Sequence, residues 1–283
     1  MVLESLTSPL RSESRPWELL VLGFVYASIA LFLALWVFEE YASLVMIFLT
    51  SMAIIPLFFN TVKFEEEKHL TVLGERDLIR EHGKAFVFLM CLFIGASTAY
   101  AFWYTVLPSD MAGSLYSAQT QTIVSLNQKV TGSATQTDIM TRIFLNNVKV
   151  MVFCIVFSFI YGTGAIFILM WNASVIGVAL GNFFRTNLAQ YAGAVGLAKL
   201  SAYLYVISLS VLRYAVHGIP EVLAYVIGGL AGGIISVAII RKDYSTPNFE
   251  RIVLDASDLV LLAMAILFVA ALLEVYVTPA FFY

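Results

Sequence analysis

Long apolar runs alternate with short polar segments along this chain. A helix needs about 20 apolar residues to cross a bilayer, and seven runs reach or approach that length. They lie near residues 17–38, 41–60, 85–107, 147–170, 198–216, 219–240 and 255–277. A weaker run, 173–190, is apolar only to Phe184. The pattern predicts an all-α, polytopic helical membrane protein with six to eight membrane segments.

Composition supports the same class. Of the 283 residues, 60% are hydrophobic and 12% are charged, and the mean hydropathy is +0.88. Soluble domains carry about 25% charged residues, so the lipid bilayer is the expected surrounding. The net charge is -3, with sixteen Lys and Arg. Because binding to a phosphate backbone requires a basic surface, nucleic acid is not expected as a partner.

Motifs for catalysis or metal binding are missing from the sequence. It contains no HExxH, GxSxG, Walker lysine loop or GxGxxG. Cys91 and Cys154 each lie in an apolar run without CxxC spacing, so buried thiols are expected rather than a disulfide or a metal site. The sequence therefore predicts no metal site, no cofactor and no enzymatic activity.

Basic residues indicate the orientation of the first half. Arg11 and Arg15 precede the first run, which is long enough to be a retained span, and residues 63–84 hold five Lys and Arg. Cytoplasmic segments of membrane proteins are enriched in these residues. The expected location is thus the cell membrane, with a cytoplasmic N-terminus and with residues 108–145 outside. Within this outer segment, residues 118–130 suit either a short amphipathic helix or a mobile loop.

The second half conflicts with simple threading. Residues 241–254 contain Arg241, Lys242 and Arg251 and should be cytoplasmic. Counting 173–190, 198–216 and 219–240 as three full spans would put them outside. The conflict disappears if 173–190 is re-entrant, or if 198–240 is one element broken around its middle. We expect one broken or re-entrant element in this half.

No linker or shift in composition divides the chain into soluble domains. The natural division is at residue 84. Residues 1–84 are predicted to form a transmembrane hairpin with a charged cytoplasmic loop, and residues 85–283 a transmembrane bundle.

The pentapeptide from His217 to Glu221 carries two ionisable groups between apolar runs. Such groups are costly at membrane depth and suggest a site. Pro220 predicts a helix start with Glu221 in its first turn, and Arg213 is the expected partner of Glu221. Two interpretations stay open: a proton-handling, ion-handling or metal-binding pair, or polar groups satisfied at a structural kink. The full candidate polar site comprises His217, Gly218, Glu221, Arg213, Asn146 and Asn147.

Asn146 and Asn147 open the fourth apolar run. An asparagine there can cap a helix by accepting a backbone N–H. Alternatively, its amide reaches across the bundle towards the region of His217, because amides in hydrocarbon seek partners on other helices.

Small residues recur at four-residue spacing in two runs. This spacing lets helix backbones approach closely, so we expect helix packing there, within the chain or in a homo-oligomer. The residues concerned are Gly177, Gly181, Gly228, Gly229, Gly232 and Gly233.

Three stretches in this order resemble the stage II sporulation protein M family of bacterial and archaeal membrane proteins. They are the pair Asn146-Asn147, WNASVIGVALG at 171–181, and HGIPEVLAYVIGGLAGG at 217–233. The resemblance covers about residues 85–283, and the hairpin 1–84 is additional to it. It implies a multi-span protein, and its sporulating members help anchor a peptidoglycan-degrading machine during engulfment.

Three functions follow as hypotheses. The first is a membrane scaffold or assembly factor, in which segment 63–84 or 108–145 holds a membrane or cell-envelope protein. The second is an ion- or proton-coupled channel or transporter with its site at His217 and Glu221. The third is an intramembrane hydrolase that uses the same pair as metal ligands or general base, although no third ligand or nucleophile is evident.

Overall fold

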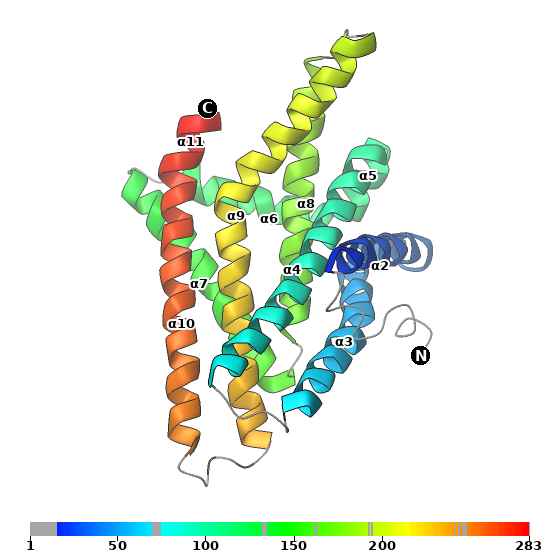
Figure 1. Ribbon diagram of the computed structural model, residues 1–283. Helices are drawn as coiled ribbons and strands as arrows, with labels where there is room; N and C mark the ends of the chain where they lie inside the picture. Colours follow the sequence, from blue (N-terminus) through cyan, green and yellow to red (C-terminus); the bar gives the residue numbers. More distant parts are fainter. Residues whose placement is uncertain are drawn as a thin grey trace.

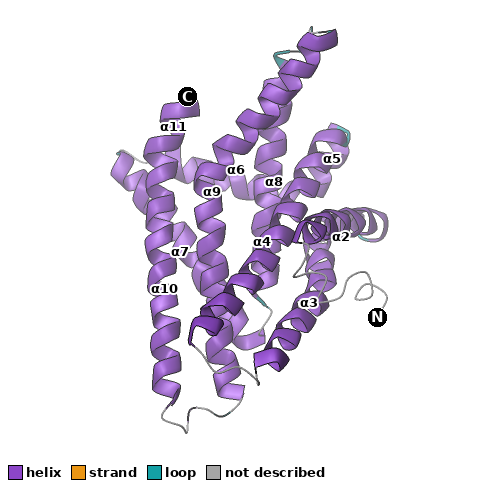
Figure 2. Ribbon diagram, viewed as in Figure 1, coloured by secondary structure: helices purple, strands orange, loops and turns teal. Residues whose placement is uncertain are grey.

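The computed structural model describes residues 16–69, 75–131, 135–161, 164–191, 193, 195–240, 242, 244 and 248–282. These residues form helices joined by short connections, and no strand occurs among them (Figure 2). Seven of the described helical segments are long and apolar enough to cross a membrane. The chain is an all-α polytopic membrane protein, which confirms the prediction from its apolar runs.

The helices follow one another along the chain as Figure 1 shows. The N-terminal part contains α2 (Pro16–Val37), the 3-10 turn η2 (Glu39–Tyr41), α3 (Ala42–His69) and α4 (Glu75–Val106). The middle part contains α5 (Ser109–Leu115), α6 (Ser117–Thr131), α7 (Gln136–Tyr161) and α8 (Ala165–Ala189). The last part contains α9 (Gly196–Ile240), α10 (Asn248–Leu272), the π-helical turn η4 (Leu273–Val277) and α11 (Thr278–Phe282).

Helix α9 is a single helix of 45 residues that contains Pro220 in its middle. The predicted break within 198–240 and the predicted helix start at Pro220 are therefore wrong. Figure 1 shows that α9 bends near its middle but continues. A proline removes one backbone donor and one hydrogen bond, which a helix packed between neighbours tolerates by bending.

The connection between α7 and α8 corrects the other alternative. The hydropathy pattern predicts the run 147–170 as one span, but α7 ends at Tyr161 and α8 begins at Ala165. The weaker run 173–190 is therefore the later part of a helix of 25 residues, and it is not re-entrant. Hydropathy alone misses this boundary because apolar residues stand on both sides of it.

These two corrections remove the threading conflict. Four helices (α4, α7, α8 and α9) cross between segment 63–84 and segment 241–254, so both basic segments lie at the same end of the bundle. Figure 1 shows the end of α3, the start of α4, the end of α9 and the start of α10 together at its lower end. Three of the arginines used to predict the orientation, Arg11, Arg15 and Arg241, lie outside the described residues.

The outer segment is helical. The amphipathic helix predicted at 118–130 is confirmed as α6, and Figure 1 shows it running crosswise to α8 and α9. The short helix α5 precedes it and follows directly on α4.

Glycines permit close helix contacts within the chain. An alanine Cβ at Gly177 would lie 2.6 Å from the Cβ of Tyr100 on α4, and at Gly232 it would lie 2.4 Å from the carbonyl oxygen of Ile155 on α7. Gly181 and Gly228 make similar contacts with α4 and α7, while Gly229 and Gly233 approach Ala165 and Ser158. Thus the glycine faces are occupied by helices of the same chain.

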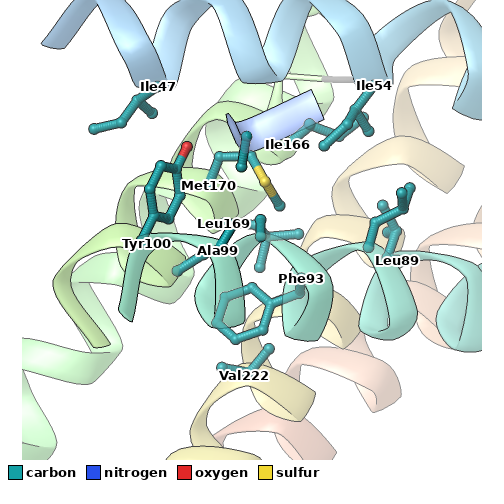
Figure 3. Packing of buried hydrophobic residues seen from close by; sticks show 14 of the residues in the cluster. Ile47, Ile54, Leu89, Phe93, Ala99, Tyr100, Ile166, Leu169, Met170 and Val222 are labelled. Carbon is teal, nitrogen blue, oxygen red and sulfur yellow. The ribbon is translucent and has the colours of Figure 1, made fainter. Parts of the chain in front are cut away.

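The hydrophobic core joins the N-terminal hairpin to the bundle. Figure 3 shows Ile47 and Ile54 of α3 above residues of α4 and α8, with Val222 of α9 beside Phe93 of α4. Since successive helical residues point about 100° apart, the packing of Val222 into this core turns Glu221 towards a different side of α9.

Candidate functional site

The carboxyl group of Glu221 lies in a polar cluster between helices. Its Oε1 accepts a 2.5 Å hydrogen bond from Nδ2 of Asn147 on α7. Asn147 is buried, with 6% of its surface exposed. An unpartnered carboxyl group at this depth would be costly, so this contact stabilises α9 against α7. It matches the hypothesis that an asparagine of the fourth run reaches across the bundle.

The capping interpretation of the two asparagines is wrong. Both lie well inside α7, which begins at Gln136. The helix start is instead capped by Thr135, whose Oγ1 accepts a hydrogen bond from the backbone N–H of Asp138 and donates one to its carboxylate. Asn146 is partly buried and, one residue before Asn147, points about 100° away from the contact.

Glu274 brings a second carboxyl group to this cluster. It lies in the π-helical turn η4, which contacts both α7 and α9, and it interacts electrostatically with Glu221. Tyr225 and Cys154 adjoin the two carboxyl groups. Sequence reasoning noted Glu274 only as one of several charges near apolar runs. Its position inside the apolar run 255–277 was the available signal, because a carboxyl group there needs a partner.

His217 reaches the same turn from one helical turn before Glu221. Its Nδ1 lies 3.2 Å from Oγ1 of Thr278, and that hydroxyl donates its own hydrogen to the carbonyl oxygen of Leu273. A hydroxyl has a single hydrogen. The hydroxyl of Thr278 therefore accepts from His217, so Nδ1 carries a proton and Nε2 is left as the second site of the imidazole.

Arg213 does not take the position predicted for it. Its guanidinium lies over the ring of Phe183, 4.8 Å from the centroid, and also near Tyr214. Eight residues separate Arg213 from Glu221 on one helix, which corresponds to about 12 Å along the axis. The expected pairing of Arg213 with Glu221 is therefore wrong, and the partner of Glu221 is an amide from another helix.

Gly218 and Pro220 shape the helix around the cluster without closing it. A Cβ placed on Gly218 would meet no atom within 4 Å, so close packing does not explain a glycine there. Among the described residues, no group of three or more His, Cys, Asp or Glu converges as metal ligands do. The arrangement can exchange protons between two carboxyl groups and an imidazole, or hold a cation against them.

A second buried polar cluster lies beneath α6, and sequence reasoning missed it. Gln119 is fully buried, and its Nε2 donates to the carbonyl oxygen of Ser43 on α3 and to Oγ of Ser174 on α8. Its neighbour Tyr116 donates to the carbonyl oxygen of Tyr100, and burial raises the pKa of the Tyr116 phenol well above its usual range. The phenol thus remains a neutral donor. The signal was a glutamine on the apolar side of an amphipathic helix.

Comparison with known proteins gives one match. The family model described as stage II sporulation protein M matches residues 84–279, which include α5 to α10, the turn η4 and most of α4. No curated protein matches, and no solved structure matches. The helices that carry both polar clusters, apart from α3, thus lie within the matched region.

Proposed function

Because this chain belongs to the stage II sporulation protein M family, we propose that it is a membrane scaffold or assembly factor whose outer helices α5 and α6 hold a protein of the cell envelope. The observation that carries this proposal is the way these two helices are fastened to the bundle. Their exposed side is called the outer platform below, and it consists of Ser109, Asp110, Met111, Gly113, Ser114, Thr120, Gln121, Val124 and Ser125.

The inner side of the two helices is buried. Ala112, Leu115 and Tyr116 pack into the hydrophobic core, and Gln119 binds α3 and α8 at the same time. A connecting segment without function is ordinarily mobile and loosely packed. Fastening by buried apolar and hydrogen-bonded groups supports a rigid surface that is presented to a partner.

The exposed side is polar with two larger apolar side chains. Asp110, Thr120 and Gln121 can form hydrogen bonds, while Met111 and Val124 are 41% and 47% exposed. Polar surfaces around a small apolar centre are typical of non-obligate protein interfaces. This chemistry favours a folded protein partner over lipid.

The proposal includes an orientation. The basic segments 63–84 and 241–254 lie at the end of the bundle that we assign to the cytoplasm, following the positive-inside tendency. The outer platform then faces away from the cytoplasm of a cell membrane. A sulfhydryl reagent that cannot cross membranes should label Ser114→Cys in intact cells, whereas Glu250→Cys should react only after permeabilisation.

A partner-capture experiment tests the scaffold proposal. The combined variant Asp110→Lys, Met111→Asp and Gln121→Lys alters only exposed side chains, and it should reduce recovery of a specific co-purified envelope protein about tenfold or more. The matched control carries Asp255→Lys and Asp258→Lys, which are exposed at the opposite end of the bundle, and it should retain the partner. Equal recovery with both variants would contradict the assignment to the outer platform.

A second candidate function is favoured by the carboxyl groups of Glu221 and Glu274. Two acids from different helices, with Asn147 bound to one of them, resemble the midplane sites of transporters more than a plain structural kink. On this proposal the chain conducts protons or cations past the cluster.

Flux measurements separate the two functions. Reconstituted vesicles with the wild-type chain should show pH-dependent proton or cation flux, and Glu221→Gln, which keeps the size of the side chain and removes its charge, should abolish it. Asp258→Asn makes the same chemical change at an exposed position of α10 and should leave the flux intact. Absence of flux with the wild-type chain across protons and a panel of cations would exclude this candidate.

A further inference from the structure

A row of exposed apolar side chains runs along the first part of α9. It consists of Leu197, Leu200, Leu204, Ile207 and Val211, which are between 46% and 85% exposed. Their spacing alternates between three and four residues, which is the spacing of the apolar seam of a coiled coil. This row is called the α9 seam below.

The opposite side of the same helix is already occupied. Ala202 and Val206 are buried against the bundle, while Ser201 and Ser208 are exposed beside the seam. The apolar surface is thus bordered on one side by small hydroxyl groups. A surface that only contacts lipid has no need of such a border, whereas small polar flanks allow a second helix to approach.

The α9 seam projects beyond the other helices. Arg185 donates to the carbonyl oxygens of Thr105 and Leu107 at the end of α4, and Arg213 stacks on Phe183 close to that level. Because guanidinium groups prefer the edge of the hydrocarbon layer, they mark its outer boundary. Residues 196–212 precede Arg213, and Figure 1 shows the start of α9 rising above the ends of α4 and α11.

Lipid chains do not cover an apolar row at that height. The segment 196–212 contains 17 residues, which extend about 25 Å along the helix. The glycine faces that were candidates for oligomer contacts are filled by α4, α7 and α8 of the same chain. The α9 seam is therefore, among the described helices, the unpartnered surface with the spacing that a helix–helix contact requires.

We propose that the α9 seam of one chain pairs with the α9 seam of a second copy in a parallel two-stranded coiled coil. Insertion into one membrane gives all copies the same orientation, so a two-fold axis along the membrane normal brings identical seams together in register. Two heptads are too short for a stable coiled coil in solution. Confinement to the membrane raises the effective concentration of the second seam and compensates for this.

Disulfide cross-linking in native membranes tests the pairing. Leu204→Cys should yield a covalent dimer on mild oxidation at least about fivefold more than Leu261→Cys, because a residue in the seam faces its own copy across the two-fold axis. Leu261 on α10 is a matched control, since the two leucines are 60% and 64% exposed. The wild-type chain, whose Cys91 and Cys154 lie within the bundle, supplies the background.

Two further variants distinguish a specific seam from random collision. Leu200→Cys should also cross-link, while Ser201→Cys, one residue away and beside the seam, should cross-link much less. Adding Ile207→Asp to Leu200→Cys should suppress the dimer, since a carboxylate in the seam is repelled by its copy. Equal cross-linking at Leu204, Ser201 and Leu261 would overturn the proposal, as would the absence of a dimer at both seam positions, which would assign the seam to lipid or a different protein.

Discussion

Replacing Gly95 by alanine is expected to force α2 and α4 apart and to destabilise the protein strongly. A Cβ at this position would lie 2.1 Å from the carbonyl oxygen of Leu20, and the reciprocal glycine, Gly23, faces the carbonyl oxygen of Leu92 at 2.5 Å. Both obstacles are backbone atoms, so no side chain can rotate away. Overpacking of this kind costs about 3 kcal/mol.

The effect is measured as a loss of thermal stability of the purified protein in detergent, followed by intrinsic fluorescence. Gly113→Ala is the control, because a Cβ on Gly113 in α5 would meet nothing within 4 Å. An alanine there should leave stability equal or slightly higher, since alanine favours helix. If Gly95→Ala melts like Gly113→Ala, the close approach of α2 and α4 is not present in the protein.

Asn147→Leu is expected to destabilise the bundle at the polar cluster. Leucine is similar in size to asparagine but has no donor, so the buried carboxyl group of Glu221 loses the hydrogen bond that joins α7 to α9. Leaving a buried polar group unsatisfied costs about 1–3 kcal/mol, and more when it is charged. Asn146→Leu changes the neighbouring residue, which points elsewhere, and should have a much smaller effect.

A double-mutant cycle isolates the contact. The combined variant Asn147→Leu and Glu221→Leu removes both partners, so its loss of stability should be smaller than the sum of the two single losses by about 1–2 kcal/mol. Strict additivity, or equal effects of Asn147→Leu and Asn146→Leu, would show that the amide and the carboxyl group do not interact.

Several elements were predictable because their signals are local. Hydropathy along the chain identifies most spans, and the apolar positions between residues 118 and 130 identify α6 before its surroundings are known. Even the start of α7 has a local signal, since Thr135 and Asp138 stand at capping-box spacing. Hydropathy does not detect this start because the apolar run begins later than the helix.

The course of α9 was not predictable from its own residues. Pro220 is compatible with a helix start and with a bend inside a helix. The neighbours decide between them, because α7, α8 and α10 pack along α9 and hold its two halves together. The same neighbours settle the threading, since one continuous helix crosses once.

The sequence by itself determined that this is a helical membrane protein, that the family marks lie in its last two thirds, and that His217 and Glu221 are polar groups at membrane depth. All of these depend on composition and on order along the chain. Only the tertiary structure decided that Glu221 meets Asn147 and Glu274 rather than Arg213, and that Thr278 meets His217. Lateral neighbours depend on the rotation of each helix about its axis. Here that rotation is set by contacts between distant helices, such as those at Gly228 and Gly232, and by the π-helical turn η4, whose additional residue turns everything after it by about 100°.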